Sequence, residues 1–131
     1  MRLTKNFTLS EFVRPRVFKH PEFTPKVMSN LKELTADLQV LRDKLGRPIR
    51  VTSGFRDSKH NRRAGGVSGS FHLSGKAADI VVSGMVPMEV YEVAKGLRDE
   101  KRVKISGFGV YKSFLHLDIG TDYFRLFGDG L

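Results

Sequence analysis

A stripe of apolar side chains between Thr24 and Gly46 is the feature that most constrains the fold. Its members recur every three or four positions and so line one side of a helix: Val27, Leu31, Leu34, Leu38, Leu41 and Leu45. Thr24 is suited to cap the first turn, and Pro25 suits the first helical position because that position needs no N–H donor. Gly46, followed by Pro48, is typical of a helix end. We predict a helix between Thr24 and Gly46 whose leucine face packs on a core.

Four short apolar segments are typical of strands, at 49–53, 77–82, 106–111 and 114–119. The interval 87–100 has the pattern of a second helix, which buries Val90, Val93, Ala94 and Leu97. Residues 54–75 are rich in glycine, serine and charge, so we predict a long ordered loop with one helical turn. The aromatic residues at 123–127 are expected to pack back as a cover. Together these elements predict an α+β fold, in which helices flank a small, largely antiparallel sheet.

Length and composition favour one folded domain over residues 1–131. The chain has 131 residues, of which 40% are hydrophobic, enough for a single core. It has no cysteine, which excludes disulfides, thiolate metal clusters and a cysteine nucleophile. No stretch approaches the roughly 18 consecutive apolar residues of a membrane span, and the start lacks the apolar run of a secretory signal. We therefore expect a cytoplasmic product as synthesised, no membrane association and a monomer.

The positive charge is concentrated in the first half of the chain. The net charge is +9, and the first 66 residues hold 15 of the 23 basic side chains but only 6 of the 14 acidic ones. Such a distribution attracts polyanions, namely nucleic acid, anionic membrane or a wall polymer. The alternative is a solvated face that only maintains solubility. Because Phe55 is the one aromatic residue within the basic cluster at 47–63, we expect no nucleic-acid partner.

Three residues are candidate metal ligands. Asp79 is the only charge in an apolar strand segment, where an ionised carboxylate needs a cation or donors nearby. His72 precedes that strand, and His116 lies in another apolar strand, on the same face as Asp118. Two imidazoles, one carboxylate and an open position form the ligand set of a catalytic zinc site. The spacing alone leaves an alternative open, in which Asp79 pairs with an arginine and both histidines are ordinary half-buried residues.

Three ordered motifs then resemble a known family. They are SGFR at 53–56, the pattern Ser-x-His-x-x-Gly-x-Ala-x-Asp at 70–79 and His-Leu-Asp at 116–118. The sequence resembles the M15 zinc peptidases, which are D-alanyl-D-alanine carboxypeptidases and related cell-wall endopeptidases, many of them phage endolysins. The opening FTLSEF is similar to the start of the compact branch of that family, so the resemblance spans about residues 7–120. It implies a zinc D-Ala-D-Ala-peptidase-like fold of the hedgehog type, with Zn²⁺ held by His72, Asp79 and His116.

The resemblance also implies roles for two further residues. Arg56, in the SGFR motif, corresponds to an arginine that faces the substrate and the developing oxyanion; its alternative role is a salt bridge that fixes the long loop. Relatives carry an acidic residue three positions before the last zinc histidine, or a histidine two positions before it. Those positions hold Ser113 and Phe114 here. Asp118 is the substitute candidate for the catalytic base, or else a carboxylate that orients a zinc histidine.

The leading hypothesis from the sequence is a zinc peptidase that hydrolyses peptide bonds in peptidoglycan stems or cross-links. Such an enzyme would lyse or remodel the wall, would be of phage or bacterial origin, and would reach its substrate after release from the cytoplasm. The substitution of the usual base keeps a second hypothesis open, namely a non-catalytic binding protein on the same fold.

Overall fold

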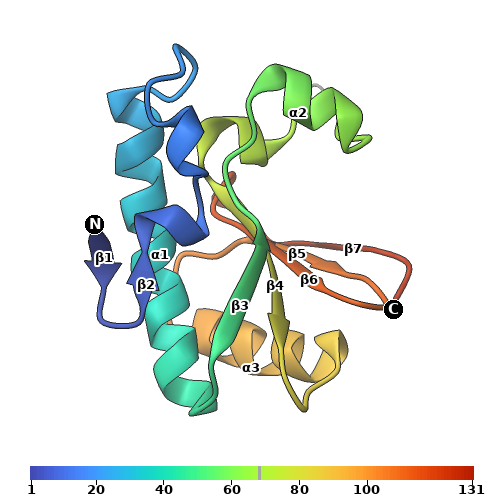
Figure 1. The fold of residues 1–131 in the computed structure, drawn as a ribbon. Helices are drawn as coiled ribbons and strands as arrows, with labels where there is room; N and C mark the ends of the chain where they lie inside the picture. The colour runs from blue at the N-terminus through green and yellow to red at the C-terminus, as the bar shows by residue number, and fades with distance from the viewer. Residues whose placement is uncertain (68) are drawn as a thin grey trace.

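The computed structural model describes residues 1–67 and 69–131 as one mixed sheet with helices packed against it, preceded by a small hairpin (Figure 1). The α-helices and 3-10 helices are η1 (Leu9–Glu11), η2 (Pro15–Val17), α1 (Pro25–Leu45), α2 (Ser58–Arg63), η3 (Phe71–Ser74) and α3 (Pro87–Asp99). The strands are β1 (Arg2–Thr4), β2 (Phe7–Thr8), β3 (Ile49–Ser53), β4 (Ala77–Val82), β5 (Gly107–Val110), β6 (Leu115–Asp118) and β7 (Arg125–Phe127). Among the described residues, no helix is long and apolar enough to cross a membrane.

The main sheet has the strand order β3-β4-β6-β5-β7. The pairs β3–β4, β4–β6 and β5–β6 are antiparallel, whereas β7 pairs in parallel with β5. The prediction of a largely antiparallel sheet is therefore wrong, because the sheet is mixed. The reason lies in the tail, which we expected to act only as a cover. After β6 the chain reverses direction and pairs on the free edge of β5, and a reversed strand there runs parallel to β5.

The apolar face of the sheet packs against α1 and α3. Ala78, Ile80, Phe108, Leu115 and Leu117 are buried with the leucine face of α1 and with Val90, Ala94 and Leu97 of α3. The predicted limits of α1 are confirmed: the Val27 N–H donates to the Thr24 side chain at 3.2 Å, and Gly46 ends the helix in the left-handed conformation, at φ 65°.

The opposite face of the sheet carries the polar residues. Side chains alternate along a strand, so Asp79, His116 and Asp118 point away from α1 and α3. The connection between β3 and β4 crosses this side of the molecule (Figure 1). It contains two short helices, α2 and η3, where the sequence predicted a single helical turn. Asp57 caps α2 by accepting the His60 N–H at 2.7 Å, and the Ser70 hydroxyl accepts the His72 N–H at 3.2 Å.

The hairpin of β1 and β2 is held against α1 by one side chain. The Gln39 Oε1 atom accepts the Thr4 hydroxyl and the Asn6 N–H, both at 2.8 Å. This contact positions the start of the chain. The segment after β2 contacts the connection between β3 and β4, where the Phe55 N–H donates to the Phe12 carbonyl at 2.9 Å.

Candidate metal site and cleft

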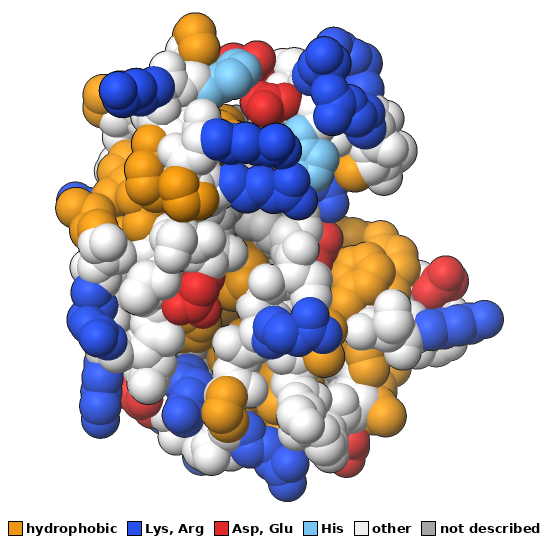
Figure 2. Space-filling view, in the orientation of Figure 1, with side chains coloured by type: hydrophobic (Ala, Val, Ile, Leu, Met, Phe, Trp, Pro, Cys, Tyr) orange, Lys and Arg blue, Asp and Glu red, His pale blue; other side chains and the backbone are white. Residues whose placement is uncertain are grey.

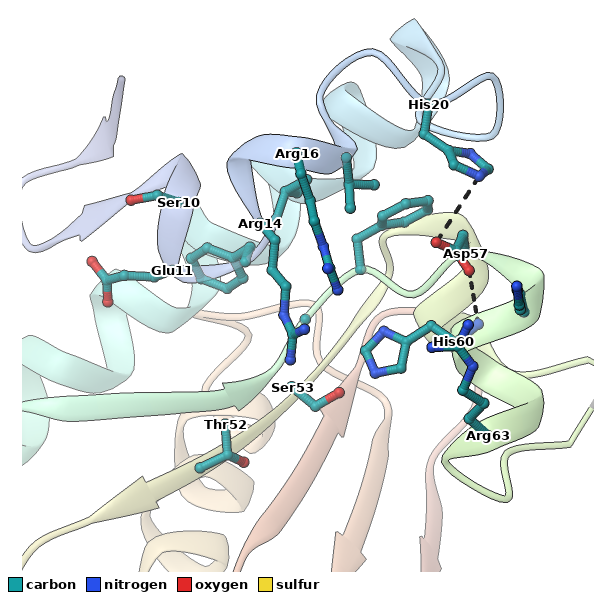
Figure 3. A pocket seen from close by; sticks show the side chains of 16 residues that line it. Ser10, Glu11, Arg14, Arg16, His20, Thr52, Ser53, Asp57, His60 and Arg63 are labelled. Carbon is teal, nitrogen blue, oxygen red and sulfur yellow. Dashed lines mark hydrogen bonds and ion pairs between the residues drawn. The ribbon is translucent and has the colours of Figure 1, made fainter.

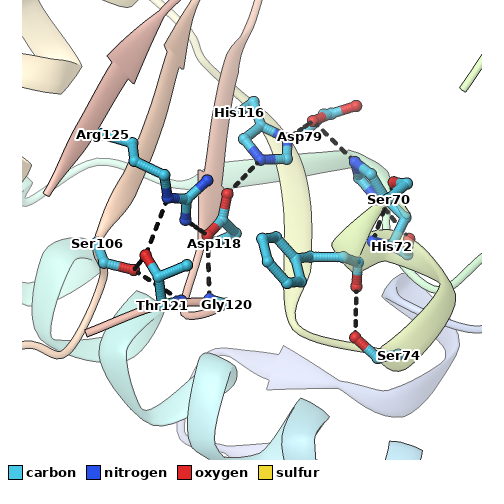
Figure 4. Close-up of polar contacts among 12 residues, drawn as sticks. Ser70, His72, Ser74, Asp79, Ser106, His116, Asp118, Gly120, Thr121 and Arg125 are labelled. Atoms are coloured by element: carbon cyan, nitrogen blue, oxygen red, sulfur yellow. Dashed lines mark hydrogen bonds and ion pairs between the residues drawn. The ribbon is translucent and has the colours of Figure 1, made fainter. Parts of the chain in front are cut away.

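The three predicted ligands converge on the polar face of the sheet (Figure 4). The antiparallel register places Asp79 of β4 directly opposite His116 of β6, and η3 brings His72 beside them. The Asp79 Oδ1 atom lies 3.1 Å from the His116 Nδ1 atom and 3.3 Å from the His72 Nε2 atom. Their possible ligand atoms all lie within 4.8 Å of one another, so the group is compact enough to hold one metal ion.

The outer nitrogen of each imidazole is held by an acceptor. The His72 Nδ1 atom lies 2.8 Å from the Gly54 carbonyl oxygen, and the His116 Nε2 atom lies 2.8 Å from the Asp118 Oδ2 atom. Carbonyl and carboxylate oxygens only accept, so the outer nitrogens carry protons; an inner nitrogen donates to Asp79 while it is protonated and presents a lone pair once that proton has left. Two lone pairs and a carboxylate oxygen then face each other, an arrangement that fits a cation.

The protonation of this group follows from its contacts. Burial by itself would raise the pKa of Asp79, but hydrogen bonds with His116 and His72 outweigh it and hold that pKa well below its usual range. Burial would lower the pKa of His116, yet the hydrogen bonds to Asp118 and Asp79 raise it. Asp79 is therefore ionised at neutral pH, and a divalent cation competes with a proton for the inner nitrogen of His116.

Asp118 is enclosed on the far side of His116 and is 0% exposed. One carboxylate oxygen accepts from His116, and the other accepts the Gly120 N–H at 3.0 Å and pairs with the Arg125 guanidinium. Burial would raise the pKa of Asp118, but the hydrogen bonds from His116 and Arg125 outweigh it and lower that pKa. With both oxygens engaged, Asp118 has the geometry of a carboxylate that orients a histidine rather than of a free base.

Two glycines in β5 leave room for these contacts. A Cβ atom on Gly107 would collide with the Asp118 carboxylate and the Arg125 guanidinium. A Cβ atom on Gly109 would lie 2.7 Å from the Phe127 ring and 2.9 Å from the His116 Cβ atom. The absence of side chains at both positions lets β7 bring Arg125 onto Asp118 and the Phe127 ring against His116.

Arg56 lies at the same site and touches three elements. Its Nη2 atom lies 3.3 Å from the Asp79 Oδ2 atom, its Nε–H donates to the Ser53 hydroxyl at 3.0 Å, and its Nη1–H donates to the Asn61 Oδ1 atom at 3.3 Å. The contacts with Ser53, Asn61 and Asp79 are those of a residue that fixes the end of β3 to α2 and β4, and they place the guanidinium at the border of the candidate metal site.

A cleft of about 460 Å³ opens above these side chains. One wall is the segment around Gly65, Gly66 and Gly69, and the other carries three aromatic side chains, Tyr111, Phe114 and Phe127. Neither these aromatics nor Arg125 was predicted from sequence to line the site. The β5–β6 alternation could have placed Tyr111 on the polar face, whereas nothing signalled the β7 residues, because the tail was not predicted as a strand.

Tyr111 is a further titratable residue in the lining of the cleft. Burial, followed by the nearby charges of Asp79 and Asp129, raises its pKa, so the phenol stays protonated at neutral pH. Its ring stacks on Phe114 with a centroid separation of 4.7 Å. The hydroxyl is thus a hydrogen-bond donor at the rim of the site.

Comparison with known proteins identifies a sequence family that spans these residues. The sequence model of the family described as Peptidase M15 matches residues 5–118, which include the candidate ligands, Arg56 and Asp118. No curated protein matches the chain in a sequence search.

Proposed function

Because this chain belongs to the peptidase M15 family, we propose that it is a zinc peptidase that hydrolyses peptide bonds in the stems or cross-links of peptidoglycan. The family supports a hydrolase. The observation that carries the zinc-dependent reaction is the convergence of His72, Asp79 and His116 below an open cleft, with the inner atoms arranged to accept a cation. The chain then acts on the wall as a lysing or remodelling enzyme.

Each residue of the site has its own role in the proposed reaction. His72 Nε2, Asp79 Oδ1 and His116 Nδ1 would hold Zn²⁺, which when bound polarises a carbonyl and makes water nucleophilic near neutral pH. Arg56 borders the same point, so its guanidinium stabilises negative charge that develops on the substrate carbonyl oxygen. Asp118 keeps the His116 ring in the tautomer and orientation that a ligand needs.

The shape of the cleft suits a peptide of small residues. Gly65, Gly66 and Gly69 in its lining have no side chains, so a peptide backbone can approach closely at these positions, beside the side chains of Ala64 and Val67. The opposite aromatic wall offers flat apolar surfaces against which short side chains such as the methyl group of alanine can pack. Peptidoglycan stems contain such residues, which supports the proposed substrate class.

One observation favours the second candidate, a binding protein that does not cleave. Among the described residues that line the cleft, no carboxylate is free to act as a general base, because Asp79 faces the histidines and Asp118 is enclosed. Tyr111 remains protonated at neutral pH, so its hydroxyl is not a phenolate base.

Mass spectrometry of fragments released from purified peptidoglycan separates the two candidates. The protein would be incubated with the wall after zinc loading, after chelation and after zinc is restored to the chelated sample. We expect new peptide ends in the first and third samples only, and the ends name the bond that is cut. Zinc-loaded, folded protein that binds several wall types and releases nothing would overturn the peptidase and favour the binding protein.

We expect the substitution Asp118→Asn to weaken zinc affinity by about 10- to 100-fold, the usual effect of removing a residue that orients a metal-binding histidine. The amide loses the charge that both His116 and Arg125 contact. Zinc affinity would be measured by competition with a chelating dye, with circular dichroism to verify folding. Asp122→Asn is the matched control, because Asp122 is exposed and its carboxylate makes no described contact. Equal affinities in the two variants would contradict the orienting role.

A further inference from the structure

A second groove, of about 500 Å³, lies between the N-terminal segment and α2 (Figure 3). Arg14 and Arg16 extend into it from the N-terminal side, and Lys59 and Arg63 line it from α2. We call these four side chains the groove cations. All four are exposed. Figure 2 shows basic side chains gathered around the histidines on this part of the surface.

The groove carries more positive than negative charge, because its four cations face only two carboxylates, Glu11 and Asp57. Among residues 1–67 and 69–131, no groove cation takes part in an ion pair or a side-chain hydrogen bond. The two acidic residues of the lining have other partners. Glu11 accepts the Thr8 N–H at 2.9 Å, and Asp57 accepts the His60 N–H and lies 4.0 Å from the His20 Nε2 atom. A concave surface with four unpaired cations favours an anionic ligand.

The rest of the lining argues against a ligand that stacks. The two phenylalanine side chains there, Phe12 and Phe55, are only 3% and 7% exposed, and Phe55 packs against Phe23. The other rings are the half-buried imidazoles of His20 and His60, and His20 faces Asp57. Single-stranded nucleic acids depend on exposed aromatic rings as well as on charge. The groove also holds the hydroxyl groups of Ser10, Thr52 and Ser53, each of which has one partner within the protein and keeps capacity for a further hydrogen bond to a hydroxylated ligand.

We propose that this groove binds a polyol phosphate, the phosphodiester polymer class of bacterial cell walls, through the groove cations. The proposal rests on the proposed function in one respect, because a wall-directed peptidase is the reason to expect a wall polymer. Guanidinium groups bind phosphate with paired N–H donors, and a polymer without bases needs no stacking surface.

The groove and the candidate metal site share one segment of chain. Ser53 lines the groove and accepts a hydrogen bond from Arg56, and the next residue, Gly54, accepts from His72. A polymer chain held in the groove is therefore held beside the cleft. Binding there would raise the local concentration of the wall at the cleft, because such polymers are attached to the same peptidoglycan whose peptides the cleft would cut.

Binding of fluorescently labelled poly(glycerol phosphate), followed by anisotropy, tests the site. The triple variant Arg14→Gln, Arg16→Gln, Arg63→Gln would be compared with Lys26→Gln, Lys32→Gln, Arg50→Gln, which loses the same charge from exposed positions elsewhere. We expect the groove variant alone to lose at least about tenfold in affinity, and its slope of log affinity against log salt to fall by roughly 2. Equal losses in both variants, no binding by the wild type, or equally tight binding of an oligothymidylate with as many phosphates would overturn the proposal.

A second arm separates this inference from the proposed function. Peptide release would be measured on peptidoglycan from which the anionic polymer has been removed. We expect the groove variant to release peptides there as fast as the wild type, because the groove cations lie outside the metal site. If the wild type releases peptides but does not bind the polymer, the peptidase proposal is supported and the groove proposal is rejected. If it binds the polymer but releases no peptides, the groove proposal is supported and the peptidase proposal is rejected.

Discussion

Replacing His72 by alanine should remove most of the bound zinc and reduce peptide release from peptidoglycan to background. His72 is 3% exposed and supplies one of three inner ligand atoms, so no solvent-exposed group can replace it without rearrangement. A catalytic metal contributes several kcal/mol of transition-state stabilisation, so the rate should fall by about a thousandfold or more. Zinc per protein, by elemental mass spectrometry, and fragment release would be measured on the same samples.

The matched control for this prediction is Leu73→Ala. It removes side-chain volume from the neighbouring position of η3 but no ligand atom. We expect Leu73→Ala to keep both zinc and activity, apart from a modest loss of stability. A His72→Ala variant that retains one zinc ion per chain and releases peptides would show that the metal is held elsewhere.

Elements with a regular spacing of apolar residues were predictable from sequence. Elements that form by pairing with a segment distant in the sequence were not. The stripe from Val27 to Leu45 and the apolar segments at 49–53 and 77–82 match α1, β3 and β4 closely. β7 is three residues long and exists because it pairs with β5, a partner that no local pattern reveals. α2 consists of polar residues, SKHNRR, so no spacing of apolar residues marked it in the sequence.

The candidate ligands were predictable for a related reason. A charge in an apolar strand, as at Asp79, calls for a compensating group, and alternation placed His116 and Asp118 on one face. Sequence could not decide between the two roles of Asp118, because that choice depends on Arg125, which β7 delivers from outside the motif. For Arg56, likewise, contacts with Ser53 and Asn61 become visible only once the connection between β3 and β4 is folded.

Replacing Arg56 by lysine should lower kcat by about 10²- to 10³-fold, the usual effect of removing one donor to a developing oxyanion, while zinc content is kept. The guanidinium donates along three directions, to Ser53, Asn61 and Asp79. The lysine ammonium keeps the positive charge but is a compact group without the planar set of donors. It therefore cannot contact Ser53, Asn61 and Asp79 and a substrate oxygen at the same time. The loss of kcat would be measured as single-turnover peptide release from peptidoglycan, with zinc content determined on the same samples.

Ser53→Ala distinguishes a role in the reaction from a role in fixing the loop. It removes the acceptor of the Arg56 Nε–H but leaves the guanidinium charge beside Asp79. If Arg56 stabilises charge on the substrate, Ser53→Ala should lower kcat by less than about tenfold, since a net hydrogen bond contributes about 1 kcal/mol, while both variants lose thermal stability. If instead Arg56 only ties the end of β3 to α2, the two variants should lose kcat in proportion to their loss of stability. The assignment of Arg56 to the oxyanion would be rejected if Arg56→Lys lowered kcat only in that same proportion to its loss of stability.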